Sequence, residues 1–253
     1  MLTALRHLFA RRPRRAGPAA APELAPPRPD RPFIAVGDVH GRADLLRALE
    51  ARLADLPPDW PLVFVGDYVD RGEESAAVLR HLMQEAPRPR VCLMGNHEDM
   101  LLRFLEAPEA EARRWLRNGG LQTLASFGVG GSPAQAPVAA RDALVEAMGP
   151  EVIAWLRARP LHWQSGDVAV VHAGADPALP LGGQPREALL WGHPDFARGA
   201  RDDGLWILHG HTIVEAPRAE GGRIAVDTGA FATGRLTAAV VEPGGVRFLG
   251  TGG

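Results

Sequence analysis

The sequence predicts an α/β fold with parallel strands, and two observations carry this prediction. Short apolar runs of strand length alternate with segments of helical periodicity over the first hundred residues. Each run is followed at once by glycine or histidine, as at the carboxyl end of a buried strand. Parallel strands need a crossover connection that is usually a helix, so this alternation is typical of an open sheet covered by helices.

The apolar runs give the expected order of strands in the first part of the chain. The first run, 33–36, precedes a segment in which leucine recurs at helical spacing, at positions 45, 46, 49 and 53. A second run at 62–65 precedes a helix expected over 73–84, and a third run lies at 91–94. These residues therefore predict a β-α-β-α-β series.

The second part of the chain predicts a helical segment and then further strands. Residues 98–160 are expected to be mostly helical, with a Gly- and Pro-rich loop at 128–137, and to form a rim or cap beside the site. A fourth buried strand is expected at 168–171. Strand-like segments separated by glycine turns close the chain, at 205–208, 223–227, 236–242 and 246–249.

The composition excludes several classes of protein. The net charge of the 253 residues is −2, which argues against a general nucleic-acid-binding protein. The single cysteine, Cys92, excludes a disulfide framework and a cysteine-rich zinc site. The chain has no lysine, which excludes Schiff-base chemistry. It also has no apolar run of about eighteen residues, so no transmembrane helix is expected.

Residues 1–31 differ from the rest of the chain. They hold seven arginines against two acidic residues, and they become rich in proline and alanine after Arg12. We expect a disordered tail here and a folded domain over 32–253. As an alternative, the tail makes weak contact with a membrane surface through a short basic helix with an apolar face, formed by Leu2, Leu5, Leu8 and Phe9. No apolar core of a secretion signal follows the charges, so we expect a cytoplasmic protein.

Side chains that can bind metals follow each expected strand, where the carboxyl ends of strands form sites in open α/β sheets. They stand in five short motifs, GDVHG (Asp38, His40), GDYVDRG (Asp67, Asp70, Arg71), GNHE (Asn96, His97), HAG (His172) and GHT (His211). Oxygen and nitrogen donors without cysteine suit Mn, Fe or Zn. Asp67 is the first acid after the second strand, and is therefore the natural carboxylate to bridge a pair of ions.

In this order, the five motifs resemble those of the phosphoprotein phosphatase family of metallophosphoesterases, in its compact bacterial form, over about residues 33–242. The resemblance implies a four-layer α/β/β/α sandwich with two mixed sheets. It also implies two divalent transition-metal ions, with Mn expected and Fe or Zn as alternatives. The implied ligands are Asp38 and His40 for the first ion, Asp67 as the bridge, and Asn96, His172 and His211 for the second.

The resemblance further implies the residues that act on phosphate. Asp70 and His97 resemble an Asp–His pair whose imidazole donates a proton to the leaving oxygen, while Arg71 and Asn96 contact the phosphate. The sequence departs from close bacterial relatives at His193, which stands where they carry a second phosphate-binding arginine. Four interpretations stay open: His193 binds phosphate when protonated, Arg198 or Arg201 reaches in, substrate binding is weaker, or specificity differs.

These observations predict a metal-dependent phosphomonoesterase of the protein serine/threonine phosphatase type. The expected substrates are phosphorylated proteins or peptides, with phospho-Ser and phospho-Thr first and phospho-Tyr in addition, attacked by a metal-bridging hydroxide. The alternative enzyme is a dinucleoside polyphosphate hydrolase of the symmetrical diadenosine tetraphosphatase type. Such relatives tend to carry GNHD and lack the Asp of DRG, so Glu98 and Asp70 favour the phosphatase.

Three further interpretations concern an alternative class of function, the charge of Glu98, and the residues His209 and Asp227. An alternative of another class is a non-catalytic phosphate-binding module; the histidine at 193 suggests it, and the complete set of ligands speaks against it. Glu98 is interpreted as a charge in the first turn of a helix. His209 is interpreted as a core residue or a neighbour of the metal ligands, and Asp227 as part of a structural turn.

Overall fold

The computed structural model describes residues 24–199 and 201–252. Its first part follows the expected series, with β1 (Phe33–Val36), α1 (Ala43–Arg52), β2 (Leu62–Phe64), α2 (Ser75–Met83) and β3 (Arg90–Cys92). The helical segment contains α3 (Asn96–Glu106), α4 (Pro108–Trp115), the π-helical turn η1 (Leu116–Gly120), α5 (Leu121–Ser126) and α6 (Pro137–Arg157). The remaining elements are β4 (His162–Ser165), β5 (Val168–Val171), η2 (Leu181–Gly183), α7 (Arg186–Trp191), β6 (Trp206–His209), β7 (Arg218–Glu220), β8 (Arg223–Ala225), α8 (Ala230–Thr233), β9 (Thr237–Glu242) and β10 (Gly245–Gly250).

The strands form two mixed sheets, as expected. The first sheet has the order β10-β9-β1-β2-β3, in which β1, β2 and β3 are parallel and β9 is antiparallel to both of its neighbours, β1 and β10. The second sheet has the order β4-β5-β6-β8-β7, with β5, β6 and β8 parallel and antiparallel strands at both edges. In the first sheet β1 and β2 are buried within the sheet and β3 forms one edge, whereas in the second sheet the parallel strands occupy the middle.

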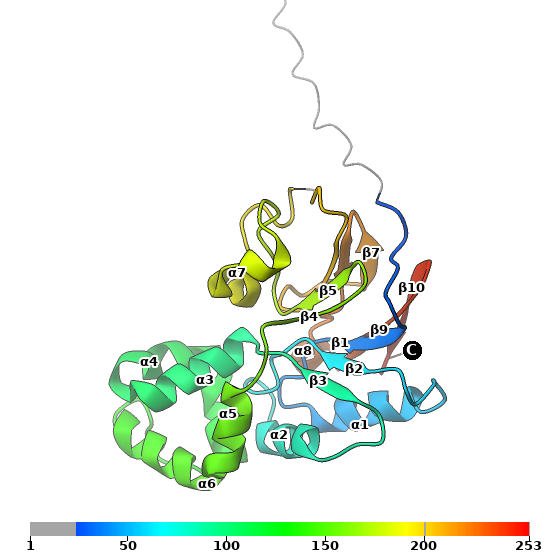
Figure 1. Ribbon diagram of the computed structural model, residues 1–253. Coiled ribbons are helices and arrows are strands. Elements are labelled where there is room, and N and C mark those ends of the chain that lie inside the picture. The colour runs from blue at the N-terminus through cyan, green and yellow to red at the C-terminus, as the bar shows by residue number, and fades with distance from the viewer. Residues whose placement is uncertain (1–23, 200, 253) are drawn as a thin grey trace, which may run out of the picture.

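The two sheets pack face to face between outer layers of helix and loop. Along β1, Phe33 and Ala35 pack toward the second sheet, whereas Ile34 and Val36 pack toward α1 and α2. This alternation follows from the two-residue period of a strand. Figure 1 shows α1 and α2 below the first sheet and α7 beyond the second. The four-layer α/β/β/α arrangement is therefore confirmed.

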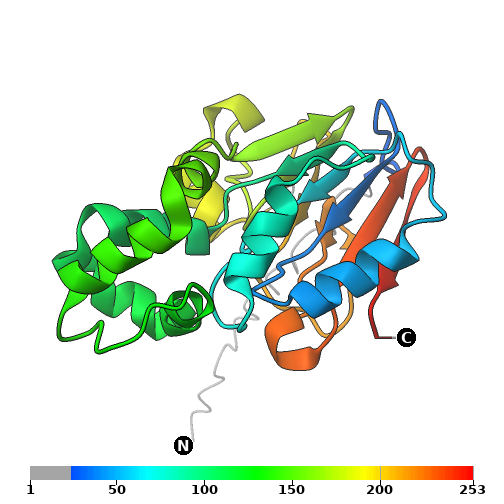
Figure 2. The same cartoon turned by 90° about the horizontal axis from the view of Figure 1, so that it is seen from below.

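Helices α3 to α6 form a group at one side of the layers (Figures 1 and 2). The expectation of a mostly helical 98–160 is confirmed, and the chain between α5 and α6 is the loop expected near 128–137. Trp115, Leu144 and Leu156 in this group are fully buried and belong to the same apolar cluster as α1 and α2. The group is thus packed firmly against the first sheet.

The folded part begins before the boundary expected from composition. Residues 24–31 lie along the second sheet: the backbone N–H of Arg28 donates to Asp167 Oδ1 at 2.6 Å, and the Trp206 indole N–H donates to Ala25 O at 2.9 Å. Extended proline-rich chain can still pack against a sheet when its carbonyls find donors. The alternative of a short basic helix near the start of the chain lies outside the described residues. Within the described ranges, no helix is both long and apolar enough to cross a membrane.

Candidate active site

Asp67 lies at the centre of a cluster of buried imidazoles. Its Oδ2 is 3.5 Å from His40 Nε2 and 3.9 Å from His97 Nε2, and its Oδ1 is 3.4 Å from His172 Nε2. These residues follow β1, β2, β3 and β5, so four strand ends from both sheets supply them. Asp67 is the carboxylate that faces both sides of the cluster, which agrees with its expected bridging position.

A second group of ligand atoms gathers around Asn96. The Asn96 Oδ1 is 2.7 Å from His172 Nε2 and 2.9 Å from His211 Nδ1. Asp38 joins the cluster through its carboxylate, which accepts the backbone N–H of His211 at 3.0 Å. The structure therefore brings all six expected metal ligands to one place.

The protonation states of these side chains suit metal binding. Burial lowers the pKa of His40 to about 3 and that of His172 to about 4, so both imidazoles are neutral at pH 7. Their Nδ1 atoms lie 2.8 and 3.1 Å from the carbonyls of Val69 and Val65, which leaves each Nε2 lone pair directed into the cluster. Metal ligation by histidine needs this neutral form with one nitrogen held in place.

The buried carboxylates in the cluster repel one another, so a bound cation would stabilise their charged forms. Burial, Asp227 and Asp67 together raise the pKa of Asp38, because three buried acids lie near one another. Two groups of potential ligand atoms share Asp67: it stands with His40 and His97 in one, and with His172 and His211 in the other. The residues therefore fit a pair of divalent ions with oxygen and nitrogen donors.

The backbone of the cluster is strained at the functional residues. Every non-glycine residue with positive φ in the described ranges is an expected site residue, and these are His40, Asp67, Asp70, Arg71 and His211. Such conformations cost about 1–3 kcal/mol each and persist only where the surroundings enforce them. The glycines beside them allow close approach: a Cβ on Gly95 would lie 2.2 Å from Asp67 Oδ1.

Glu98 lies in the first turn of α3, as expected, and its carboxylate has an additional role that the sequence analysis did not give it. It is fully buried at the start of α3, and its carboxylate accepts the backbone N–H groups of Asp67, Tyr68, Val69 and Gly95 at 2.7–3.2 Å. The carboxylate turns back into the protein, where it pairs three N–H groups of the loop after β2 and the N–H of Gly95 at the start of α3. Glu98 therefore holds the loop that carries Asp67.

The expected Asp–His pair is present beside the cluster. His97 Nδ1 donates to Asp70 Oδ2 at 2.7 Å, and both side chains are buried. Burial alone would lower the pKa of His97, but Asp67 and Asp70 raise it above its usual value. The guanidinium of Arg71 lies 3.0 Å from both His40 Nε2 and His97 Nε2, and it stacks on the ring of Phe231. Arg71 thus faces the point where the metal ligands and the pair meet.

The structure does not bring His193 to this cluster. Its Nε2 lies 3.7 Å from Asp176 Oδ2, and its Nδ1 accepts the backbone N–H of Asp195. The Arg201 guanidinium donates to the Asp203 carboxylate and to the carbonyls of Asp176 and Leu179 after β5, so it does not reach the cluster.

Another arginine, which sequence reasoning missed, lies on the side of the cluster near His211. The guanidinium of Arg114 on α4 stacks over the Trp191 ring at 4.6 Å, and the Trp191 ring meets the His211 ring edge-on at 6.2 Å. No periodicity or motif in the sequence indicates this contact, because α4 and α7 are far apart along the chain.

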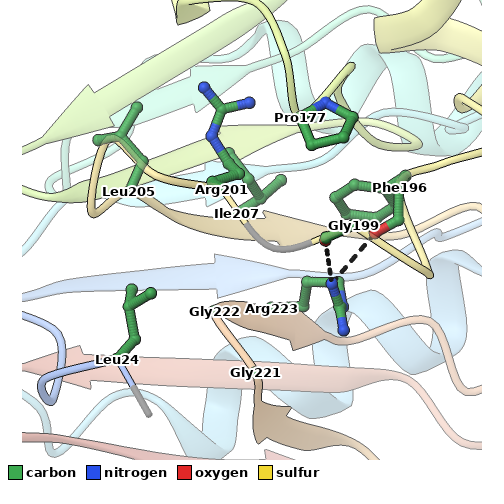
Figure 3. A pocket seen from close by; sticks show the side chains of 10 residues that line it. All are labelled: Leu24, Pro177, Phe196, Gly199, Arg201, Leu205, Ile207, Gly221, Gly222 and Arg223. Carbon is green, nitrogen blue, oxygen red and sulfur yellow. Dashed lines mark hydrogen bonds between the residues drawn. The ribbon is translucent and has the colours of Figure 1, made fainter. Parts of the chain in front are cut away.

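His209 lies outside the metal cluster and is a core residue, which is one of the two interpretations that the sequence allowed. It is buried against Phe196, with ring centroids 5.0 Å apart, and its Nδ1 lies 3.0 Å from Gly210 O. A small cavity nearby, shown in Figure 3, is lined by Phe196, Arg223 and Leu24 among others. Its volume of about 10 Å³ leaves room for one water at most, and no metal ligand lines it. This cavity therefore has no room for a substrate.

Two stacked mixed sheets whose strand ends supply buried carboxylates and imidazoles define a metal-dependent hydrolase. Residues 31–215 match the calcineurin-like phosphoesterase family, and the chain belongs to that family. It is therefore a metal-dependent phosphoesterase with the metallophosphoesterase fold.

Three comparisons place the chain among known proteins. It is 31% identical over 185 residues to the asymmetrical bis(5'-nucleosyl)-tetraphosphatase PrpE of Bacillus velezensis, covering 66% of this chain and 69% of the relative. Over 85 residues it is 40% identical to serine/threonine-protein phosphatase 2 of Escherichia coli, covering 34% of this chain and 37% of the relative. The crystal structure of a proposed diadenosine tetraphosphatase superposes with a TM-score of 0.61 at 21% identity, covering 90% of this chain and 98% of that one.

Proposed function

We propose that this protein hydrolyses dinucleoside polyphosphates, cleaving a phosphoanhydride bond at the metal cluster. The observation that carries the proposal is the similarity to a bis(5'-nucleosyl)-tetraphosphatase across two thirds of the chain. The expectation of a protein phosphatase depended on Glu98 and on Asp70. Glu98 no longer supports it, because its carboxylate binds backbone N–H groups and not substrate. The difference between GNHE and GNHD therefore says little about which phosphate ester binds.

The arrangement of cations supports a substrate with several phosphates. Arg71 lies beside His40 and His97, and Arg114 stacks on Trp191, whose ring meets the His211 ring edge-on. A guanidinium fork matches the oxygens of phosphate. A phosphomonoester offers one charged group, whereas a polyphosphate chain offers several in a row, so two separated arginines are better matched to the chain.

The residues of the site then divide the work. Asp38, His40, Asp67, Asn96, His172 and His211 would hold two divalent ions, which lower the pKa of water and neutralise phosphoryl oxygens when bound. Arg71 binds the phosphate under attack. Asp70 holds the Nδ1–H of His97, so that Nε2 carries the proton that is donated to the leaving oxygen.

One observation favours a second candidate, the phosphoprotein phosphatase. An intact Asp70–His97 pair is most useful when the leaving group is a poorly stabilised alkoxide, as in phosphoserine, because such an oxygen needs the proton most. The match to serine/threonine-protein phosphatase 2 adds to this, although it covers a third of the chain.

The deciding experiment compares kcat/KM for diadenosine tetraphosphate and for a phosphoseryl peptide, with purified protein and Mn²⁺. We expect the tetraphosphate to be preferred by about tenfold or more, a difference of about 1.4 kcal/mol in transition-state binding. Preference for the peptide would overturn the proposal in favour of the second candidate. Ion binding without turnover of either substrate or of p-nitrophenyl phosphate would instead support the non-catalytic phosphate-binding module.

A matched pair of variants tests the part given to the second arginine. Arg114→Gln is expected to lower kcat/KM for the tetraphosphate about 10- to 100-fold, the value of a charged hydrogen bond, and to leave p-nitrophenyl phosphate unaffected. Arg113→Gln changes an exposed neighbour on the same helix and serves as the control. Equal rates for the two variants on the tetraphosphate would remove Arg114 from the substrate site.

A further inference from the structure

The buried Asp70 carboxylate receives hydrogen bonds from three side chains. His97 Nδ1 donates to Oδ2 at 2.7 Å, Thr123 Oγ1 donates to Oδ1 at 2.6 Å, and Trp115 Nε1 lies 3.0 and 3.1 Å from the two oxygens. Asp70, Trp115 and Thr123 are all completely buried. Two of the three donors therefore come from α4 and α5, and not from the motifs at the strand ends.

The same segment also holds the backbone of the loop. The N–H of Asp70 donates to Thr123 Oγ1 at 2.9 Å and to Ser75 Oγ at 3.1 Å, and the N–H of Arg71 donates to Gly119 O at 3.3 Å. Asp70 and Arg71 have φ values of 71° and 69°. Two successive left-handed residues without glycine need such partners to remain in place.

The local structure of residues 115–123 explains how these donors reach Asp70. The π-helical turn η1 contains Gly119 at a φ of 106°, and a Cβ there would lie 2.5 Å from the Arg71 N. A Cβ on Gly120 would lie 2.5 Å from the Trp115 ring. Gly119 thus allows close contact with the loop at a kink between α4 and α5, and Gly120 allows close contact with the Trp115 ring.

We propose that Trp115 and Thr123 are positioning residues that act through Asp70 on the orientation of the His97 imidazole. The proposal rests on the proposed hydrolysis of phosphate esters or anhydrides by this site. Thr123 has one hydroxyl proton and uses it on the carboxylate while its lone pairs accept the Asp70 N–H, so one side chain fixes both the carboxylate and its backbone. Without these bonds the carboxylate rotates, and the His97 ring loses the alignment that proton donation needs.

The test uses two aryl phosphates that differ in their need for a proton. Phenyl phosphate has a poor leaving group and p-nitrophenyl phosphate a good one, so damage to the Asp70–His97 pair slows the first more than the second. For Thr123→Val and Trp115→Phe we expect kcat for phenyl phosphate to fall about tenfold further than kcat for p-nitrophenyl phosphate, with KM unchanged. Thr123→Ser retains the hydroxyl and is expected to restore the wild-type ratio.

Ser126→Ala is the matched control for the fold of α5. Its hydroxyl accepts the Ala76 N–H at 3.1 Å and does not contact Asp70, so its loss is expected to leave the ratio of the two substrates unchanged. Equal slowing of both substrates by Thr123→Val, or failure of Thr123→Ser to restore the ratio, would overturn the proposal. This test uses only the two aryl phosphates, so its outcome does not depend on whether the tetraphosphate or the phosphopeptide is the preferred substrate.

A spectroscopic measurement on the protein without turnover supplies an independent readout. The chain has six tryptophans, so its ¹H–¹⁵N spectrum holds six indole signals, and Trp115→Phe identifies one of them by its loss. We expect Thr123→Val and Asp70→Asn to move that signal, because each changes the carboxylate that accepts the indole proton. A signal at the same position in both variants would reject the hydrogen bond on which the proposal depends.

Discussion

Replacing Glu98 by alanine tests whether a buried carboxylate holds the loop that carries Asp67. In the structure, four backbone N–H groups donate to this side chain, those of Asp67, Tyr68, Val69 and Gly95. Alanine leaves all four without an acceptor in a place that water reaches poorly, since Glu98 is fully buried.

The expected loss of stability follows from the number of donors. A buried N–H without a partner costs about 1–3 kcal/mol, so four give about 4–12 kcal/mol. Burial and the neighbouring Asp67 raise the pKa of Glu98 to about 8, so keeping it charged in the folded protein itself costs free energy, which alanine removes. The lower end is therefore expected, a fall of about 4 kcal/mol in the free energy of unfolding, or about 8–16 °C in Tm.

Urea unfolding of the metal-free protein measures this difference directly, and Mn²⁺ titration of the folded variant shows whether the ligand loop survives. Glu106→Ala is the control: it removes a glutamate from the same helix whose exposed carboxylate lies 3.4 Å from Arg157, a surface pair worth at most about 1 kcal/mol. If Glu98→Ala destabilises the protein no more than Glu106→Ala does, the assignment of Glu98 to the loop is wrong.

Three further predictions concern other parts of the molecule. Arg71→Lys removes the guanidinium fork, so kcat/KM for diadenosine tetraphosphate is expected to fall about 10- to 100-fold. A wild-type kcat/KM in this variant would contradict the contact between Arg71 and phosphate. Burial lowers the pKa of His209 to about 4, against about 6.5 in an unfolded chain, so its contribution to stability is present above pH 6.5 and lost as the pH falls toward 4. For the metal-free protein, His209→Gln should reduce the slope of the free energy of unfolding against pH between pH 4 and 6.5. An unaltered slope would refute the prediction. Burial raises the pKa of Cys92 to about 12, so a disulfide reagent should label it only in urea, and rapid labelling of the native protein would count against this.

The sequence was sufficient to predict the parallel strands and the cluster of polar side chains at their carboxyl ends. Parallel strands buried on both faces read as uninterrupted apolar runs, and the chain turns directly after each one. Asp38, Asp67 and His172 follow such runs, so their convergence could be predicted from their order along the chain. The two short edge strands β4 and β7 were missed, because edge strands face solvent and carry no apolar run.

Contacts between the helical group and the cluster could not be predicted from the sequence. Trp115 and Thr123 lie 45 and 53 residues from Asp70, and no local pattern encodes a contact at such a separation. Glu98 did carry a signal, because a glutamate three residues after the N-cap Gly95 can accept the N–H of that residue, as the glutamate of a capping box does. Its burial depends on the packing of α3 against the strand ends, which only the tertiary structure shows.

The five left-handed residues of the cluster set a limit on how this enzyme can be engineered. Together they cost about 5–15 kcal/mol, as much as the whole net stability of an ordinary domain. Glycine at any of them would relax the backbone and delete a reactive side chain in the same step. Searches for heat-tolerant variants should therefore return inactive proteins at these positions, and libraries are better directed to exposed helix faces far from the ions.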